Sequence, residues 1–176
     1  AAGQYVNGNL RKGIATATTS KNFEIGDAVN YAPVQIIFAN AVTNATGSIT
    51  ASTTGTDHPQ INVSEINPSL SANRYWTLTN ASVAGFGTYS ATFNFDAADV
   101  DGGANTSSFV VNRYVPSTWS TPTIGTVTAT STQAIGLGLS EFGDFQVGEL
   151  ATAIVPCAFN ANTNSGINII PCITDI

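Results

Sequence analysis

Alternation of apolar and polar residues is the feature of this sequence that most limits the folds open to it. In the run Tyr89–Phe95 every second residue is apolar, and the residues between are Ser, Thr and Asn. The run Arg74–Thr79 places Trp76 and Leu78 on one side in the same way. Successive side chains of a strand point to opposite faces, whereas a helical face repeats every 3.6 residues. Both runs therefore indicate strands with one face in a core and the other toward water.

More uniformly apolar segments predict central strands at Val34–Ala39 and Phe109–Tyr114. Further strands are predicted at residues 5–12, 22–25, 48–52, 124–130, 144–148 and 150–155. One helical turn is predicted at Pro68–Ala72. Straight-chain helix formers are scarce, with two Lys, four Glu, six Leu and no Met. Strands that recur about every 8–12 residues predict an all-β fold, an antiparallel β-sandwich.

The charge of the chain excludes some partners. Only 9% of its 176 residues are charged, and the net charge is −6. The basic residues are too few and too scattered to bind phosphates, so no nucleic acid is expected: Arg11, Lys12, Lys21, Arg74 and Arg113. No apolar run approaches the roughly 18 residues of a membrane span. The start at Ala1 without Met fits a secreted chain after signal removal, and also a fragment expressed without a tag.

Both cysteines, Cys157 and Cys172, lie near the C-terminus, and the residues between them are rich in Asn. Their spacing suits a disulfide hairpin, and closing such a loop would stabilise the fold by about 3 kcal/mol. Two free thiols in a reducing compartment are the alternative. We expect the disulfide because the other features of the sequence favour an extracellular location.

Six short segments occur in an order that resembles a known module: FEIG (23–26), NYAPV (30–34), NRYWTL (73–78), ATFNF (91–95), ADVD (98–101) and FGDFQVGE (142–149). The pattern, which covers roughly residues 4–149, resembles a β-sandwich module of secreted and surface proteins of Bacteroidetes-type bacteria. The resemblance implies an Ig-like sandwich outside the cell with a structural or adhesive role and no catalytic residues. It also implies core positions at Tyr75, Trp76, Phe93 and Phe95, and turn-shaping positions at Gly26, Gly143 and Gly148.

The chain departs from this module after Glu149, so we divide it into a sandwich, residues 1–149, and a C-terminal strand and hairpin, residues 150–176. The apolar residues of this tail are Leu150, Ile154, Val155, Ile167, Ile169, Ile170, Ile173 and Ile176. A free apolar segment would aggregate, so we expect it to cover a surface. It either packs on its own sandwich or completes the sheet of another copy by strand addition.

Two residue groups are candidates for chemistry. The densest set of oxygen ligands, Asp96, Asp99, Asp101 and Asn105, fits a calcium loop loosely, since calcium takes six to eight oxygens. The alternatives are a solvated acidic turn or a glycosidase carboxylate pair. His58 is the only histidine and has no nucleophile motif beside it. We therefore interpret it as an exposed loop residue.

Other residues are candidates for binding or cross-linking. Trp119 follows Ser and Thr and is the better exposed of the two tryptophans for stacking on a sugar, whereas Trp76 is predicted to be core. Lys12 and Lys21 could form an isopeptide with an Asn, although ordinary surface lysines are the simpler interpretation.

These observations favour a structural subunit of an extracellular bacterial filament or surface assembly. It would polymerise with copies of itself by strand addition, with the donor in residues 150–176 or in Tyr5–Leu10. The alternative is a monomeric adhesin or carbohydrate-binding module that binds a glycan or surface ligand near Trp119 and the 96–105 loop. Neither hypothesis needs an enzyme activity or a cofactor, although calcium remains possible.

Overall fold

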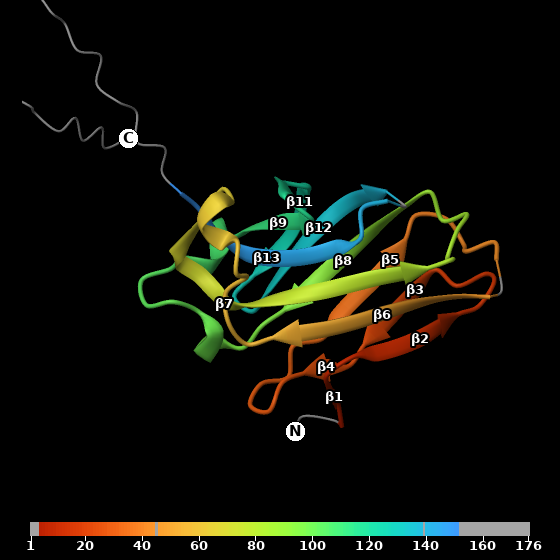
Figure 1. Ribbon diagram of the computed structural model, residues 1–176, viewed down its shortest axis with the longest axis horizontal. Coiled ribbons are helices and arrows are strands. Elements are labelled where there is room, and N and C mark those ends of the chain that lie inside the picture. The colour runs from red at the N-terminus through yellow and green to blue at the C-terminus, as the bar shows by residue number, and fades with distance from the viewer. Residues whose placement is uncertain (1–3, 45, 139, 152–176) are drawn as a thin grey trace, which may run out of the picture.

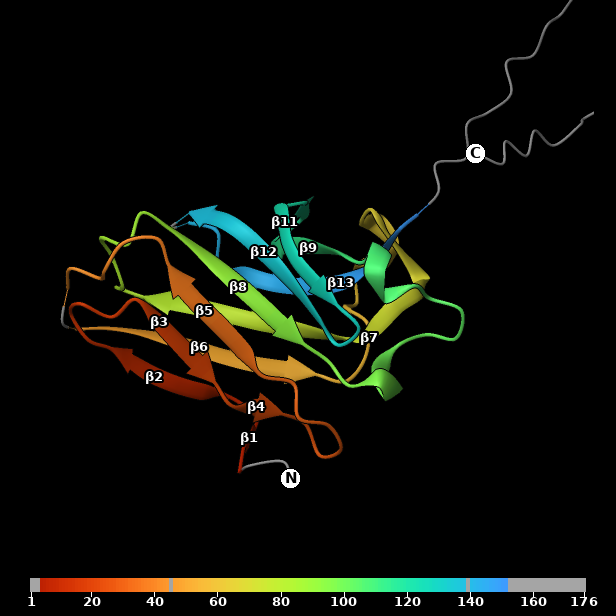
Figure 2. The ribbon, with the colours of Figure 1, turned by 180° about the vertical axis from the view of Figure 1, so that it is seen from behind.

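The computed structural model describes residues 4–44, 46–138 and 140–151, which form two facing antiparallel sheets. The six-stranded sheet has the order β10 (Thr118–Ser120), β9 (Val110–Val115), β13 (Gly143–Leu150), β7 (Ile66–Ala81), β6 (Gly47–Thr54) and β2 (Leu10–Ile14). The five-stranded sheet has the order β11 (Thr123–Thr128), β12 (Ser131–Gly138), β8 (Thr88–Asn94), β5 (Val34–Phe38) and β3 (Ser20–Phe23). Figure 1 views the molecule from the six-stranded side, and Figure 2 views it from the five-stranded side.

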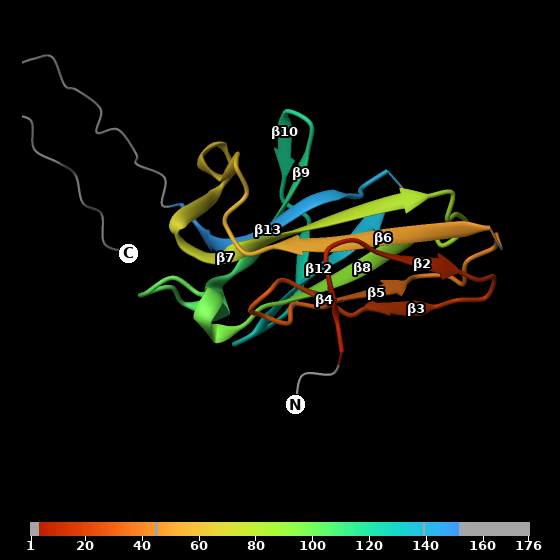
Figure 3. The same ribbon diagram turned by 60° about the horizontal axis from the view of Figure 1, so that its bottom comes forward.

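Smaller elements complete the described part of the chain. A short parallel pair joins β1 (Val6–Asn7) to β4 (Ile25–Gly26). Three 3-10 turns lie in the connections: η1 (Ile61–Val63), η2 (Ala97–Asp99) and η3 (Thr106–Ser108). Figure 3 shows the β9–β10 hairpin extending from the body of the molecule beside the loop that contains η1.

The core lies between the sheets and is built from the inward members of alternating strands. Trp76 of β7, Phe93 of β8 and Phe145 of β13 are fully buried. The Phe93 ring centroid lies 5.3 Å from that of Trp76 and 4.8 Å from that of Phe145. The Trp76 indole donates a hydrogen bond of 3.1 Å to the carbonyl of Ala32, so its polar atom is satisfied inside the core. Alternation thus gives each sheet one apolar face, as the sequence predicts.

The central position of β13 decides how the six-stranded sheet is completed. β13 pairs with β7 on one side and with β9 on the other, so the last described strand fills the middle of the sheet. β7 is 16 residues long and also pairs with β6. The last described strand therefore takes its backbone hydrogen bonds from strands in the middle of the chain.

The all-β prediction is confirmed, and the differences from the expected strands have local causes. The helical turn predicted at Pro68–Ala72 is wrong, because this segment belongs to β7 and Ser71 pairs with Gly148 of β13. β12 was not expected, because Gly136, with a φ of 74°, interrupts its alternation. Leu150 is the last residue of β13 and lies opposite Ile66.

Two expectations about single positions are also corrected. Tyr75 is not in the core but half-buried on the outer face of the six-stranded sheet, while its neighbour Arg74 is fully buried. Gly148 lies within a strand rather than a turn, and a Cβ there would come within 2.6 Å of Ile66. This glycine therefore permits close packing of β13 on β7.

Candidate functional site

The outer face of the five-stranded sheet is uncharged over β3, β5, β8 and β12. Its outward side chains are exposed or half-buried and are all neutral: Ser20, Asn22, Gln35, Ile37, Ser90, Thr92, Asn94, Ser131, Gln133 and Ile135. Asn22, Gln35, Thr92 and Gln133 lie opposite one another on successive strands. Because adjacent strands are about 4.8 Å apart, this row of amides and a hydroxyl spans about 14 Å.

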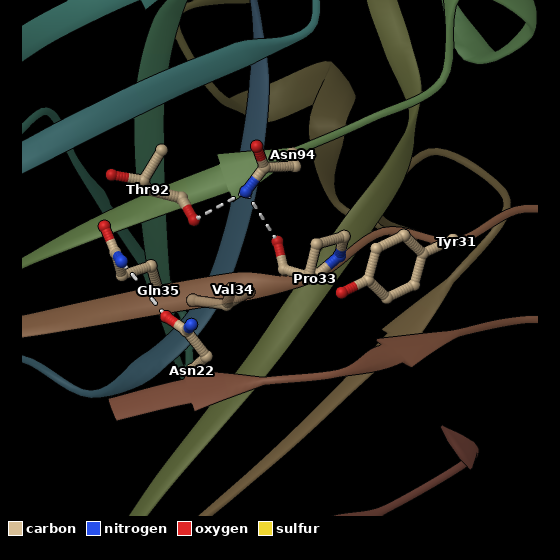
Figure 4. Close-up of a pocket in the computed structure, with 7 residues that line it drawn as sticks. All are labelled: Asn22, Tyr31, Pro33, Val34, Gln35, Thr92 and Asn94. Atoms are coloured by element: carbon tan, nitrogen blue, oxygen red, sulfur yellow. Dashed lines mark hydrogen bonds between the residues drawn. The ribbon is translucent and has the colours of Figure 1, made fainter. Parts of the chain in front are cut away.

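A hollow of about 240 Å³ is lined by three of the four residues of this row, as Figure 4 shows. Its lining carries no charge and consists of Asn22, Tyr31, Pro33, Val34, Gln35, Thr92 and Asn94. Gln35 Nε2 donates to Asn22 Oδ1 at 3.1 Å, and Asn94 Nδ2 donates to the carbonyl of Pro33 at 3.0 Å. These bonds hold three amides in place and leave Gln35 Oε1, Asn22 Nδ2 and Asn94 Oδ1 without a hydrogen-bond partner among the described residues.

Tyr31 forms the aromatic wall of the hollow and is 39% exposed. Its ring lies against Tyr5, with ring centroids 5.4 Å apart, and the Tyr5 hydroxyl donates to the carbonyl of Asp27. Gly26 makes this arrangement possible, because a Cβ there would meet the Tyr5 ring at 2.5 Å. Burial and the charge of Glu24 raise the pKa of the Tyr31 phenol, so its hydroxyl remains a donor at neutral pH.

One edge of the same sheet is also without charge. β11 pairs with β12 on one side, and no described strand pairs with its other side, although the turn η3 also contacts β11. The sequence contains no charged residue between Arg113 and Glu141, a stretch that includes β10, β11 and β12. Open edges usually carry charges or irregularities that prevent pairing with other chains. β11 has only Pro122 before it and a register shift between Ile124 and Val127.

The opposite edges of the two sheets are basic. β2 carries Arg11 and Lys12, and β3 carries Lys21. Lys12 forms an ion pair with Glu24, and its Nζ lies 5.9 Å from the ring centroid of Phe23. The lysines proposed for an isopeptide therefore lie on edge strands, and Lys12 already has a carboxylate partner.

Arg74 is the most deeply buried charge among the described residues and makes three kinds of contact. Its Nε and Nη2 donate to Asp99 at 2.9 and 3.0 Å, Nη2 donates to Asp27 at 2.7 Å, and Nη1 donates to Thr53 at 3.2 Å. Burial opposes the charge of Arg74, but the hydrogen bonds that it donates to Asp99 and Asp27 outweigh this effect and raise the pKa of Arg74. Asp99 is therefore occupied by a guanidinium group.

The other members of the predicted calcium loop also have protein partners. Asp96 accepts from the backbone at the start of η2, and Asn105 does so at the start of η3. Asp101 accepts from the Ser71 amide at 2.9 Å and from Asn73 Nδ2 at 2.7 Å. In the described ranges no three His, Cys, Asp or Glu side chains are gathered to hold a metal. The calcium site stays a prediction, and these four side chains cap the turns, pair with Arg74 or accept hydrogen bonds from β7.

Asp57 and Asp101 approach the same serine at the start of β7. The Ser71 hydroxyl donates to Asp57 at 2.9 Å, and Gln146 Nε2 donates to the same Asp57 oxygen at 3.2 Å. Burial raises the pKa of Asp57, the charge of Asp101 raises it further, and the two hydrogen bonds oppose this only in part. The charged form of Asp57 is therefore less favourable in the folded protein than in water.

His58 is in a loop as expected, but the expectation that it is exposed is wrong, because it is 5% exposed. Its ring packs against Tyr75, Tyr114 and Trp119, with centroid distances of 5.1, 4.7 and 5.0 Å. Nε2 lies 3.2 Å from Asp144, and Nδ1 accepts from the Gln60 amide at 3.1 Å. Both ring nitrogens are engaged, so His58 fixes the 57–61 loop against the six-stranded sheet.

Trp119 is half-buried and belongs to the same aromatic cluster. Its Nε1 donates to the carbonyl of Gln60 at 3.0 Å, and its ring lies 5.0 Å from that of Tyr114. The residue predicted to bind a sugar therefore anchors the β9–β10 hairpin to the 57–61 loop. Its use as a ligand platform stays a prediction.

The two cysteines of the predicted disulfide and most residues of the predicted assembly strand lie outside the described ranges. They are Cys157, Cys172, Ile154, Val155, Ile167, Ile169, Ile170, Ile173 and Ile176. Leu150 is described, is 51% exposed and closes β13. In the other predicted donor, Tyr5–Leu10, Val6 and Asn7 pair with β4 of the same chain.

Comparisons with known proteins give no match. No family model matches the chain, and the searches of curated proteins and of solved structures find nothing similar at a significant level. None of the helices in the described ranges is both long enough and apolar enough to cross a membrane.

The sequence contains a signal for the hollow, but it is not visible in any single predicted strand. Asn22, Gln35 and Thr92 belong to the polar phase of three predicted strands, but nothing in the separate runs indicates that these strands are neighbours. Tyr31 follows a turn and is placed by its contact with Tyr5, 26 residues before it in the sequence. Strand order, which sequence periodicity does not specify, creates this site.

Proposed function

We propose that this chain is a structural subunit of an extracellular bacterial filament or surface assembly that polymerises by strand addition. The observation that carries the proposal is β11, an open and uncharged edge strand of six residues, Thr123–Thr128. A strand from another subunit can pair with the free backbone groups of such an edge, and no charge there opposes its approach.

The other described edges are less suited to accept a strand. β2 and β3 carry Arg11, Lys12 and Lys21, which would have to be desolvated or paired on contact. β10 has only three residues, and its Trp119 is held by the 57–61 loop. The attraction or repulsion between a basic edge and an incoming strand would depend on the charge of that strand. β11 carries no charge, so its pairing would not depend on it.

We assign the donor to residues 152–176, whose isoleucines give them strand propensity and apolar surface. The N-terminal alternative is weaker, because Val6 and Asn7 already pair with β4 and Leu10 lies in β2. In this proposal the domain is Ig-like and a Cys157–Cys172 disulfide shortens the tail into a hairpin. The extracellular location rests on the resemblance of residues 4–149 to surface modules of Bacteroidetes-type bacteria.

The test is negative-stain electron microscopy of the full untagged chain, of Thr126→Lys, and of a chain that ends at Ala151. Thr126 is exposed on β11, so a lysine there adds charge to the proposed acceptor without entering the core. Ser20→Lys is the matched control, because Ser20 is exposed on β3 at the opposite edge of the same sheet. Each variant is first compared with the parent by thermal unfolding.

We expect filaments from the parent and from Ser20→Lys, and a loss of polymer of about tenfold or more in the other two variants. If filaments still form after the tail deletion, the donor strand is the N-terminal segment instead. Loss with Ser20→Lys and not with Thr126→Lys would place the acceptor on β3 instead. Single particles of the parent at every concentration would refute polymerisation and favour the monomeric adhesin.

A further inference from the structure

We propose that the hollow lined by Tyr31, Asn22, Gln35, Thr92 and Asn94 is a binding site for an uncharged sugar unit of a polysaccharide. The site is distinct from the β11 edge, so it does not depend on whether the chain polymerises. It is also distinct from the Trp119 cluster, which lies on the six-stranded sheet.

The charge of the site limits the ligand class first. None of the seven lining residues is ionised at neutral pH, and the outward residues of β3, β5, β8 and β12 are neutral as well. Phosphate, sulfate and carboxylate ligands need Arg, Lys or clustered backbone amides, and a cation needs carboxylates. The ligand that fits is therefore neutral.

The polar atoms limit the ligand further. Gln35 Oε1 and Asn94 Oδ1 are acceptors, Asn22 Nδ2 is a donor, and the Thr92 and Tyr31 hydroxyls are both. None of these atoms has a side-chain partner among the hydrogen bonds of the described residues. Such mixed donors and acceptors match neighbouring hydroxyl groups, each of which donates and accepts.

The aromatic wall supplies the apolar part of sugar recognition. Sugars present a face of C–H groups that packs on an aromatic ring, while their hydroxyls reach the polar groups beside it. The Tyr31 ring is braced by Tyr5, and in Figure 4 its hydroxyl is directed toward the side of the hollow formed by Asn22 and Gln35. A preformed platform reduces the entropy lost when a ligand binds.

The size and shape of the site favour one unit of a chain. The hollow of about 240 Å³ is smaller than the roughly 300–1,000 Å³ of pockets that enclose a drug-sized ligand. It is open to the flat face of the sheet, where the row continues through Thr92 to Gln133. One ring would occupy the hollow, and its neighbours in a polysaccharide would follow this row.

The experiment is affinity electrophoresis of the full chain in gels that contain a single soluble polysaccharide. The neutral probes are laminarin, dextran, xyloglucan and galactomannan, and the anionic probes are polygalacturonate and heparin. We expect retardation by at least one neutral probe and by neither anionic probe. No retardation by any of the four neutral probes would overturn the proposal, as would retardation by the anionic probes alone.

Variants then test the residues. Tyr31→Ala and the pair Asn22→Ala with Gln35→Ala should each weaken binding of the retarding probe about tenfold. Tyr31→Phe, which keeps the ring, should bind within about threefold of the parent. The matched control is Trp119→Ala, which removes the other candidate platform and should leave binding unchanged. Loss of binding with Trp119→Ala and not with Tyr31→Ala would overturn the assignment. Near-ultraviolet circular dichroism shows that each variant retains the fold.

Discussion

The two sheets share one core but differ in what they carry on the outside. The elements of the six-stranded sheet contain Arg11, Lys12, Arg74, Arg113, Asp144 and Glu149, and the 57–61 loop covers one end through His58. The five-stranded sheet contains Lys21 as its one charged residue, and a shallow hollow lies on its outer face. Most charged side chains of the six-stranded sheet are held by ion pairs and hydrogen bonds within the fold, which suits this sheet to stability. The five-stranded sheet carries neutral amides that keep atoms without a partner in the described part of the chain, such as Gln35 Oε1 and Asn22 Nδ2, which suits it to contact other molecules.

The largest effect should come from the buried ion pairs. Arg74→Met would leave Asp99, with 7% side-chain exposure, and Asp27 without their cation. Removing one partner of a buried pair costs about 3–5 kcal/mol, because the remaining charge is uncompensated. Urea unfolding followed by fluorescence measures the loss.

The control for this prediction is Ser90→Ala on the outer face of the five-stranded sheet, which should change stability by less than about 0.5 kcal/mol. If the two substitutions lowered the free energy of unfolding equally, the proposed difference between the two sheets would be refuted.

The next effect should come from the loop that covers the six-stranded sheet. His58→Ala removes a buried ring that contacts three aromatic side chains and bonds Asp144. We expect a loss of about 2 kcal/mol and faster hydrogen exchange in the 57–61 loop and the β9–β10 hairpin. Exchange in β3, β5 and β8 should change only through the global loss of stability. Faster exchange in the five-stranded sheet alone would contradict the proposal that the 57–61 loop stabilises the six-stranded sheet.

The smallest effect concerns two carboxylates with opposite pKa shifts. The pKa of Asp57 is raised, so the folded protein binds this proton more tightly, and stability falls as pH rises from about 3.9 through the folded value. Burial acts to raise the pKa of Asp27, but bonds from the Asn30 and Val29 amides and from Arg74 lower it overall. Its stabilisation is present above about pH 3.9 and is lost as pH falls through the folded value.

We therefore expect Asp57→Asn to gain about 0.5 kcal/mol over the parent at pH 7 and to lose this gain toward pH 3. Asp27→Asn should be less stable than the parent at pH 7, with a difference that shrinks in acid. Thermal unfolding of both variants from pH 3 to 7 provides the measurement. If both substitutions changed stability at pH 7 in the same direction, the pKa shifts of Asp57 and Asp27 would not be opposite.

Periodicity predicts those parts of the molecule that depend on one strand at a time. The strands around Trp76 and Phe93 and the burial of these residues follow from alternation alone. Long-range pairing explains the failures: Pro68–Ala72 is extended because β13 pairs with it, and His58 is buried because β7, β9 and β10 supply its aromatic neighbours. The hollow also depends on strand order, since its residues come from β3, β5 and β8 and from the segment before β5.

The central place of β13 has a consequence for how the chain acquires its structure during synthesis. Because β13 lies between β7 and β9, a growing chain that has not reached residue 150 holds two interior edges without a partner. Both edges would be exposed to other nascent chains, and the β13–β7 pairing that covers one of them joins residues about 70 positions apart. A chain truncated before Gly143 would therefore leave the edges of β7 and β9 unpaired, and we expect it to associate with other chains. Completion of β13 covers both edges at once.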